Sequence, residues 1–364
     1  MAYFAEKNFF EDPETFARGQ EFGEGKLRFD WLDVEMERVR CSPSDPRRGL
    51  TYADCNVGRY GYDSIPEFIR NNYSMAARGS VLVPGLPDLG YTENRKSEVW
   101  SDNVVELYEE AKSRRWVPAV DVNWQALAAS EFSPPLAAAM CQLCTTLEEI
   151  ALVIMEFPSR WVFAINQEFL ELKSYLCAQM IDEARHVEVF RKRALSSGGL
   201  KRASSSVEQA LKELLLADTY TEGSLGINVL LNSLVLAVFS QAARASNVDA
   251  TIFRLCMQDT ARELSYGVGQ LRYHLSTRGG REEALNDYLD RCEHTFVGIA
   301  ASPELMEPLI LLAGGGIKRP FIDKGKQVVS RLYTRAVDDY LERLAAAGLN
   351  RRGRSRLPRF FSPA

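Results

Sequence analysis

The distribution of prolines limits this chain to few architectures. Prolines punctuate the first third of the sequence, and then none occurs between Pro158 and Pro303. That stretch is rich in Leu, Ala, Glu and Arg, which have high helix propensity, and it lacks the residue that interrupts helical hydrogen bonding. No alternating strand pattern competes with it. The sequence therefore predicts an all-α fold made of packed helices.

Four long helices are expected to form the core, with an interruption in the third near Gly223 or Gly226. They are predicted at residues 134–157, 158–196, 207–245 and 249–277. The loops between the second and third helices and between the third and fourth are short enough to join antiparallel neighbours. Further helices are expected at 102–115, 287–301 and 323–347.

The chain divides by composition into three parts. Residues 1–100 carry Phe, Tyr, Gly and Pro without clear periodicity, including the loop 78–87, and are expected to form an irregular N-terminal layer over the bundle. Residues 101–348 are expected to form the helical bundle domain. Residues 349–364 are a basic tail, which we expect to be solvated, with docking on a partner as the open alternative.

Bulk properties exclude several classes of protein. The net charge of −5 gives no reason to expect nucleic acid as a partner. The N-terminus lacks the basic start and apolar block of a secretory signal. The apolar run 225–243 is broken by polar residues and is interpreted as a buried helix, so no membrane partner is expected. The seven scattered cysteines, including Cys141 and Cys144, are interpreted as buried thiols in a reducing cytoplasm.

The most informative motif is Asp182-Glu183-Ala184-Arg185-His186 on the second helix. Glu183 and His186 are three residues apart and lie on one helical face, within an apolar stripe. A carboxylate and an imidazole buried there are costly unless they are paired or bound to a metal. Glu149, one helix upstream, is the candidate partner. The alternative is a surface Glu149 and a core His186 with satisfied hydrogen bonds.

An altered copy of the motif follows on the fourth helix as Asp259-Thr260-Ala261-Arg262-Glu263. A direct repeat would place Glu at position 260 and His at position 263. The third helix offers Glu222, which is followed by Gly223.

With these motifs, residues 107–263 resemble the carboxylate-bridged diiron proteins of the ferritin-like superfamily. The Asp182–His186 motif is similar to that of the bacterial multicomponent monooxygenase hydroxylase subunits. Residues 107–124 are similar to the entry segment of ribonucleotide-reductase-like and arylamine-oxygenase-like relatives. The resemblance implies a ferritin-like four-helix bundle with extra helices. It also implies Glu149 as the first-helix ligand, Glu183 and His186 as the second-helix pair, and Asp259 as acceptor of a hydrogen bond from His186.

The second half of the site departs from the family. At the family's spacing, the expected ligand positions 226, 260 and 263 read Gly, Thr and Glu. Glu222 and Glu263 are each displaced by one turn toward the same end of the bundle, by about 5 Å, so they are able to face each other. We therefore expect a displaced metal site with the ligands Glu149, Glu183, His186, Glu222 and Glu263.

Several neighbours complete this expected site. Asp182, Arg185, Asp259 and Arg262 would orient the ligands. Tyr266 stands where the family has its second His, and a core role for its phenol is favoured over a ligand or donor role. Gly226 and Thr260 are small and either create substrate space or mark an inactive site. Tyr266 and Thr260 are the candidate catalytic residues, and His274 on the same face is more often a core or surface residue than a ligand.

The resemblance implies an oxygen-activating oxidoreductase with two irons expected, and one ion or manganese left open. Dioxygen would be the co-substrate. The reaction would be carbon hydroxylation or amine N-oxygenation of a small organic molecule, with electrons from a reductase or ferredoxin. A homodimer or a second ferritin-like subunit is a further expected partner. Two alternatives remain open: a catalytically inactive subunit that scaffolds an active partner, and an atypical single-metal oxidase built on Glu149, Glu183 and His186.

Overall fold

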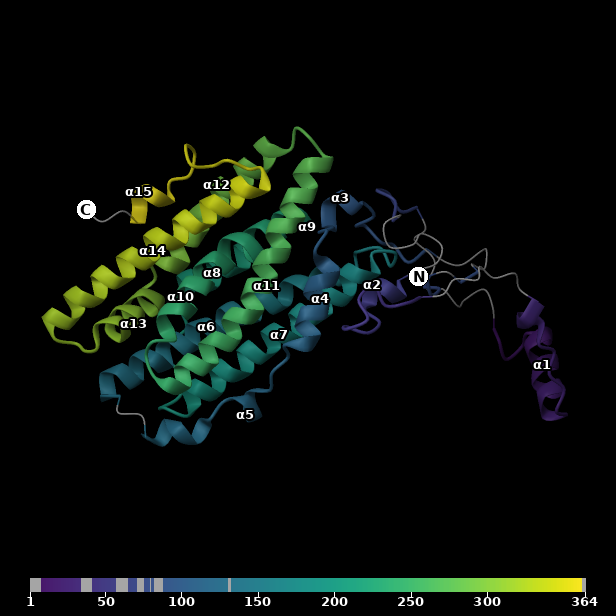
Figure 1. The fold of residues 1–364 in the computed structure, drawn as a ribbon, viewed down its shortest axis with the longest axis horizontal. Helices are drawn as coiled ribbons and strands as arrows, with labels where there is room; N and C mark the ends of the chain where they lie inside the picture. The colour runs from purple at the N-terminus through teal and green to yellow at the C-terminus, as the bar shows by residue number, and fades with distance from the viewer. Residues whose placement is uncertain are drawn as a thin grey trace. The chain divides into compact units, whose positions relative to one another are not determined.

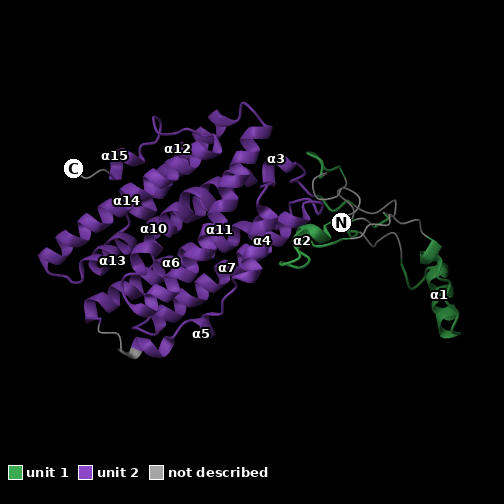
Figure 2. Cartoon of the chain, in the orientation of Figure 1, with its two compact units in different colours: residues 1–90 green, residues 91–364 purple. Residues whose placement is uncertain are grey.

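The structure is a computed structural model that describes residues 8–33, 41–56, 65–70, 75–78, 80–81, 88–129 and 132–361. The chain forms two compact units, residues 1–90 and 91–364, drawn in green and purple in Figure 2. The predicted loop 78–87 lies largely outside the described residues. The expected fold class is confirmed for the described part, which is helical and contains no strand, only an isolated bridge between Glu93 and Ile165.

The described residues of the first unit form three short elements. They are α1 (Pro13–Gly23), the 3-10 helix η1 (Asp30–Asp33) and α2 (Tyr52–Cys55). Each α-helix begins at a capping side chain. Asp12 accepts a hydrogen bond from the Thr15 amide ahead of α1, and Thr51 forms a reciprocal capping box with Asp54 at α2.

The second unit is a helical bundle (Figure 1). Its first elements are α3 (Lys96–Val99), α4 (Val104–Ser113), α5 (Pro118–Asp121) and the 3-10 helix η2 (Trp124–Ala129). The central helices are α6 (Pro134–Val162), α7 (Leu170–Leu195), α10 (Asn232–Ala242) and α11 (Asn247–Thr277). α8 (Ser205–Leu215), α9 (Tyr220–Ser224) and the π-helix η3 (Leu225–Leu231) connect α7 to α10. α12 (Glu282–Ala300), α13 (Pro303–Gly314), α14 (Arg319–Ala347) and α15 (Leu357–Phe361) complete the chain.

The core of this unit lies where α6 packs along α7 and α10 packs along α11. Apolar side chains at helical spacing, such as Leu172, Leu176 and Phe190 on α7, are fully buried there. α14 covers α10, α11 and α13 from the outside, and appears in yellow along one edge of the bundle in Figure 1.

Two predicted boundaries are wrong. The interruption expected near Gly223 or Gly226 lies instead at residues 216–219, between α8 and α9. The second helix was expected to begin at Pro158, but that proline lies inside α6, which continues to Val162, and α7 begins at Leu170. The lost amide removes one helical hydrogen bond. Burial of the neighbouring rings of Phe157 and Trp161 supports the helix through this point, because tertiary packing outweighs propensity in most protein helices.

Among the residues that the structure describes, two helical stretches are long and apolar enough to cross a membrane by length and composition alone. They are Pro134–Val162 and Tyr220–Ala242, and the paired helices α12 and α13 would count as a further, bent candidate. Within the most apolar 18 residues of each stretch, 61% are buried in Pro134–Val162 and 83% in Tyr220–Ala242. Burial in the protein core therefore accounts for their hydropathy, as expected for the run 225–243.

The basic C-terminal segment is docked, not solvated as expected. Arg351 is fully buried, and its guanidinium pairs with Glu293 at 3.1 Å and Asp290 at 2.8 Å on α12. Arg354 pairs with Glu283 at 2.8 Å and with Asp290 at 2.7 Å. The acidic face of α12 thus complements the basic segment, and this charge pairing is what the composition of the tail alone did not reveal.

Candidate metal centre

Two helices of the core bring four ionisable side chains to one buried place. Glu183 and His186 come from α7, and Asp259 and Glu263 come from α11; each is at most 1% exposed. α11 is positioned by its cap, where Ser246 accepts a hydrogen bond from the Asp249 amide. The sequence-predicted faces of these two helices therefore do meet in the core.

His186 lies between two carboxylates. Its Nδ1 is 2.8 Å from Glu183 Oε1, and its Nε2 is 3.3 Å from Asp259 Oδ2. The indole of Trp116 donates a hydrogen bond of 2.7 Å to the same Asp259 oxygen. Burial lowers the pKa of His186, but Cys256, Glu183 and Asp259 reverse this effect and hold the pKa well above its usual value. These three neighbours therefore favour the charged form of the imidazole, against the effect of burial.

Two arginines neutralise the aspartates beside His186. Arg262 Nη2 lies 2.8 Å from Asp182 and also contacts Asp259, whereas Arg185 contacts Asp182 and lies 3.3 Å from Asp259. Burial alone would raise the pKa of Asp259, but hydrogen bonding and attraction from His186 and Arg262 hold this pKa below its usual value. This network fixes Asp259 as an anion. It leaves His186 as the charged neighbour of Glu183, and it forms no ion pair with Glu263 among the described residues.

Glu263 is held on one side only. Its Oε2 accepts a hydrogen bond of 3.0 Å from Asn232 on α10, and its Oε1 has no partner among the described residues. Burial, and then repulsion from Glu183, raise the pKa of Glu263 well above its usual value. Two carboxyl groups therefore share a dry part of the core with no arginine or lysine of their own.

The buried polar atoms that lack a hydrogen-bond partner gather around these carboxyl groups. Among the described residues they include both oxygens of Glu183, Glu263 Oε1, His186 Nε2, Thr260 Oγ1, Asn232 Oδ1, Gln179 Oε1 and the Tyr175 hydroxyl. Native cores leave few such atoms, so a group of them calls for a ligand, an ion or water. Oxygen donors with one imidazole are the ligand set that suits iron or manganese.

The donors are present, but a full ligand shell is not assembled. In the part of the chain that the structure describes, no group of three or more His, Cys, Asp or Glu side chains is arranged closely enough to hold a metal ion. The residues therefore fit a metal by chemistry and by their unsatisfied atoms, while the predicted five-ligand site does not form.

Glu149 is the first departure from the predicted set. It is half-buried on α6, which packs against α8 and α13, and its charge interacts with Glu148, Glu208 and Glu304. Burial and these acids raise its pKa to about 7. Glu149 thus lies on the side of α6 that faces α8 and α13.

A pH-dependent stability follows from this placement. Because the pKa of Glu149 in the folded state is about 7, above the usual value of a glutamate, the folded state retains the proton to higher pH and stability falls as pH rises through this window. Glu149→Gln is therefore expected to raise the free energy of unfolding at pH 8 by about 1 kcal/mol after allowance for solvent screening, with no gain at pH 4. Urea unfolding at both pH values measures the difference.

Glu148→Gln is the matched control, because Glu148 pairs with Arg191 at 3.2 Å and should give no gain at pH 8. Loss of bound metal on replacing Glu149 would contradict the placement and restore the predicted ligand role.

Glu222 and Gly226 are the second departure. The charge of Glu222 acts on Tyr288 and Cys292 of α12, and a Cβ atom added at Gly226 would lie 2.6 Å from the Tyr288 hydroxyl. The structure therefore does not bring Glu222 and Glu263 together, and Tyr288 and Leu214 occupy the space expected for substrate at Gly226. The π-helix η3 explains why the prediction failed. Its turns contain more residues than α-helical turns, so the side chains of this segment face other directions than α-helical spacing would give.

Tyr266 takes the core role that was favoured for it. Its hydroxyl lies 2.6 Å from that of Tyr220 and donates to the Val99 carbonyl at 2.7 Å, while its ring packs on Tyr175 at a centroid distance of 4.8 Å. His274 is likewise held away from Glu263, with Nδ1 3.0 Å from the Ser97 carbonyl oxygen. Thr260 is buried in the cluster, and its hydroxyl has no partner among the described residues.

Three residues of the cluster were not predicted. Asn232 bonds Glu263, Asn228 accepts a hydrogen bond of 2.9 Å from Gln179, and Trp116 bonds Asp259. The signal for the asparagines was present: they are four residues apart in the apolar run 225–243, where they had been interpreted only as polar interruptions. Nothing local in the sequence relates Trp116 to Asp259, which is 143 positions away.

Comparison with known proteins places the fold. By sequence, the chain matches no protein-family model and no curated protein. By structure, it is similar to a variant of an R2-like ligand-binding oxidase with an aerobically reconstituted Mn/Fe cofactor. The TM-score is 0.50 at 18% identity, over 67% of this chain and 93% of that chain. A second variant, with an anaerobically reconstituted Mn/Fe cofactor, gives a TM-score of 0.50 at 19% identity, over 67% and 94% of the two chains. The predicted ferritin-like fold is confirmed.

Proposed function

We propose that this chain is a metal-dependent oxidase of the ferritin-like fold, with one iron or manganese ion held between α7 and α11 by Glu183, His186 and Glu263. The observation that carries the proposal is the set of buried carboxylate oxygens without hydrogen-bond partners on Glu183 and Glu263, next to His186, whose Nδ1 lies 2.8 Å from Glu183 Oε1. A cation bound by these atoms would neutralise the two buried carboxylates. The unfavourable free energy of burying their charges would then favour metal binding.

One ion is better supported than two. Ferritin-like carboxylate proteins hold two ions with a Glu from each of two helices and a Glu-x-x-His from each of the other two. Here α7 supplies a Glu-x-x-His in Glu183 and His186, and α11 supplies Glu263 alone. Glu149 and Glu222 face other helices, so the carboxylates of a second ion are lacking.

The bound metal would supply dioxygen binding and electron transfer. The chain's own residues would prepare the ligands for it. Arg262 and the Trp116 indole hold Asp259 in place. Asp259 lies beside Nε2 of His186, so the other ring nitrogen, Nδ1, faces Glu183 and would be the atom that binds the metal. Such partners set the orientation and basicity of a ligating imidazole. Burial of the whole cluster would exclude bulk water from the reaction.

A route from the surface ends beside this cluster. A groove of about 410 Å³ between α4 and α7 reaches the polar network at Asp182 and Arg185. Tyr108, Cys177 and Ile181 line its outer part. Within the proposal, this groove would admit a small organic substrate for hydroxylation or N-oxygenation, and an external reductase or ferredoxin would supply electrons. The structural neighbours, described as oxidases with Mn/Fe cofactors, support this class of chemistry.

A non-catalytic subunit is the second candidate. Its support is that Asn232 already occupies one Glu263 oxygen and that no group of three potential ligands is gathered among the described residues. In that case the cluster would stabilise a scaffold on which an active partner docks.

Removal of the His186 imidazole distinguishes the metal-dependent oxidase from the non-catalytic subunit. His186→Ala is expected to weaken manganese binding at least about tenfold, since a direct ligand matters no less than the groups that orient one. Loss of the free Mn²⁺ signal in electron paramagnetic resonance titrations measures binding. His294→Ala, at an exposed position on α12, is the control and should bind as the parent does. Equal binding by the parent and His186→Ala would refute the site, and no binding by the parent would favour the scaffold.

A further inference from the structure

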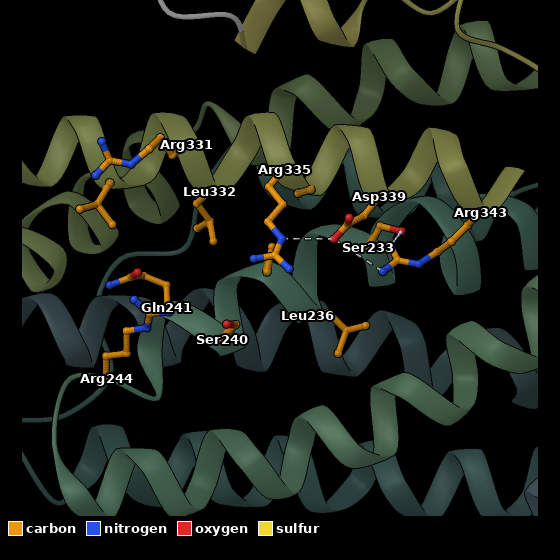
Figure 3. Close-up of a pocket in the computed structure, with 13 residues that line it drawn as sticks. Ser233, Leu236, Ser240, Gln241, Arg244, Arg331, Leu332, Arg335, Asp339 and Arg343 are labelled. Atoms are coloured by element: carbon orange, nitrogen blue, oxygen red, sulfur yellow. Dashed lines mark hydrogen bonds and ion pairs between the residues drawn. The ribbon is translucent and has the colours of Figure 1, made fainter. Parts of the chain in front are cut away.

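A second candidate site lies on the outer side of α10, in a groove of about 420 Å³ between this helix and α14 (Figure 3). The floor is apolar, with Leu236 and Ala237 from α10 and Val328, Leu332 and Ala336 from α14. Its volume falls in the range of small-molecule pockets, which combine an apolar lining with a few polar groups. None of its lining residues belongs to the metal cluster.

The charges around this floor are strongly one-sided. Arg244, Arg331, Arg335 and Arg343 line the groove, and Asp339 is the single acid among the lining residues. Arg335 Nε and Arg343 Nη2 are each 3.9 Å from Asp339, so one carboxylate is shared at the limit of ion pairing. In Figure 3 the Arg335 side chain points from α14 toward α10, across the groove. The groove therefore carries an excess of guanidinium charge that this acid does not balance.

Arg343 shows the same imbalance at the closed end. Its side chain is 30% exposed, and Nη1 donates a hydrogen bond of 3.1 Å to the neutral Ser233 hydroxyl. Burial lowers the pKa of Arg343, although Asp339 and Glu342 act in the opposite direction. A partly desolvated guanidinium with a neutral partner retains donor capacity for an anion.

We propose that this groove binds a small organic oxyanion, a phosphate ester or a carboxylate, with its charged group on the arginines that line the groove, Arg335 among them, and its carbon skeleton on Leu236 and Leu332. Guanidinium forks match both oxyanions in geometry and form strong charge-assisted hydrogen bonds with them. The apolar floor selects an organic anion over an inorganic one. The site is independent of the proposed metal ion, although both sites use the first turn of α10, where Asn232 bonds Glu263 and Ser233 bonds Arg343.

Calorimetric titration of the full chain in 0.15 M salt tests the groove with three probes: phenyl phosphate, phenylacetate and inorganic phosphate. At least one phenyl probe should bind once per chain, and inorganic phosphate should bind about tenfold more weakly because it buries no apolar area. The tighter phenyl probe identifies the oxyanion as phosphate or carboxylate.

Variants locate the binding. Arg335 is 84% exposed, so Arg335→Gln should fold, and it should weaken the probe by about tenfold or more through loss of a charge-assisted contact. Ser240→Phe fills the groove without changing charge and should block the phenyl probe. Arg319→Gln removes the same charge from an exposed position on α14 outside the groove, and should change affinity by less than about twofold.

Two results would overturn the proposal. One is the absence of saturable binding of either phenyl probe at millimolar concentration. The other is an equal loss of affinity in Arg335→Gln and Arg319→Gln, which would reduce the effect to general surface charge.

Discussion

Replacing Arg262 by methionine is expected to lower the free energy of unfolding by about 3–5 kcal/mol, the usual cost of removing one partner from a buried charge network. Arg262 contacts both Asp182 and Asp259 and is almost fully buried with them. Without it, Arg185 would be the one arginine left beside these two buried carboxylates, with His186 and the Trp116 indole still at Asp259. Urea unfolding at pH 7 measures the loss.

The control for this prediction is the same substitution at an arginine that belongs to an exposed ion pair. Arg191 on α7 lies 3.2 Å from Glu148 with its side chain 54% exposed, so Arg191→Met should cost less than about 1 kcal/mol. If Arg262→Met were equally mild, the aspartates would have to be satisfied by groups other than the arginines, and the account of a fixed Asp259 beside His186 would fail.

Glu263→Gln should have the largest effect on metal binding. The amide keeps the shape of the side chain and its contact with Asn232, but it removes the negative charge opposite Glu183. We expect affinity for Mn²⁺ or Fe²⁺ to fall by more than about hundredfold, beyond the 10–100-fold typical of groups that only orient a ligand. Binding is measured by the same paramagnetic resonance titration as for His186.

Glu222→Gln is the matched control for Glu263→Gln. Glu222 was the predicted partner of Glu263, but its charge acts on Tyr288 and Cys292 of α12. The variant should therefore bind metal as the parent does. Loss of metal in Glu222→Gln would mean that the displaced two-metal site forms after all, and retention in Glu263→Gln would remove α11 from the centre.

The fold was largely predictable because its signals are periodic and long. Proline-free helical stretches and the face shared by Glu183 and His186 are local properties, and the structure places both as expected. Pro158 was misplaced because tertiary packing of Phe157 and Trp161 outweighs a local breaker. The docked Arg351 depends on the acidic face of α12, some 60 residues away, as its pairs with Asp290 and Glu293 show.

The site was predictable only in the half that follows α-helical spacing. Glu183, His186, Asp259 and Glu263 meet because α7 and α11 are regular. The prediction for the third helix failed because η3 is a π-helix. The family's spacing, counted back from residues 259–263, gave Gly226 where the structure uses Asn228 and Asn232. No propensity marks a π-turn in a single sequence, so this register was outside the reach of spacing arguments.

The most direct measurement of the central claim is the metal content of the parent chain, determined by elemental analysis after anaerobic loading with ferrous iron and removal of loosely bound ions. The account predicts about one equivalent per chain, held by Glu183, His186 and Glu263. Two equivalents would contradict the single-ion centre, and no retained metal would contradict the metal-dependent function altogether.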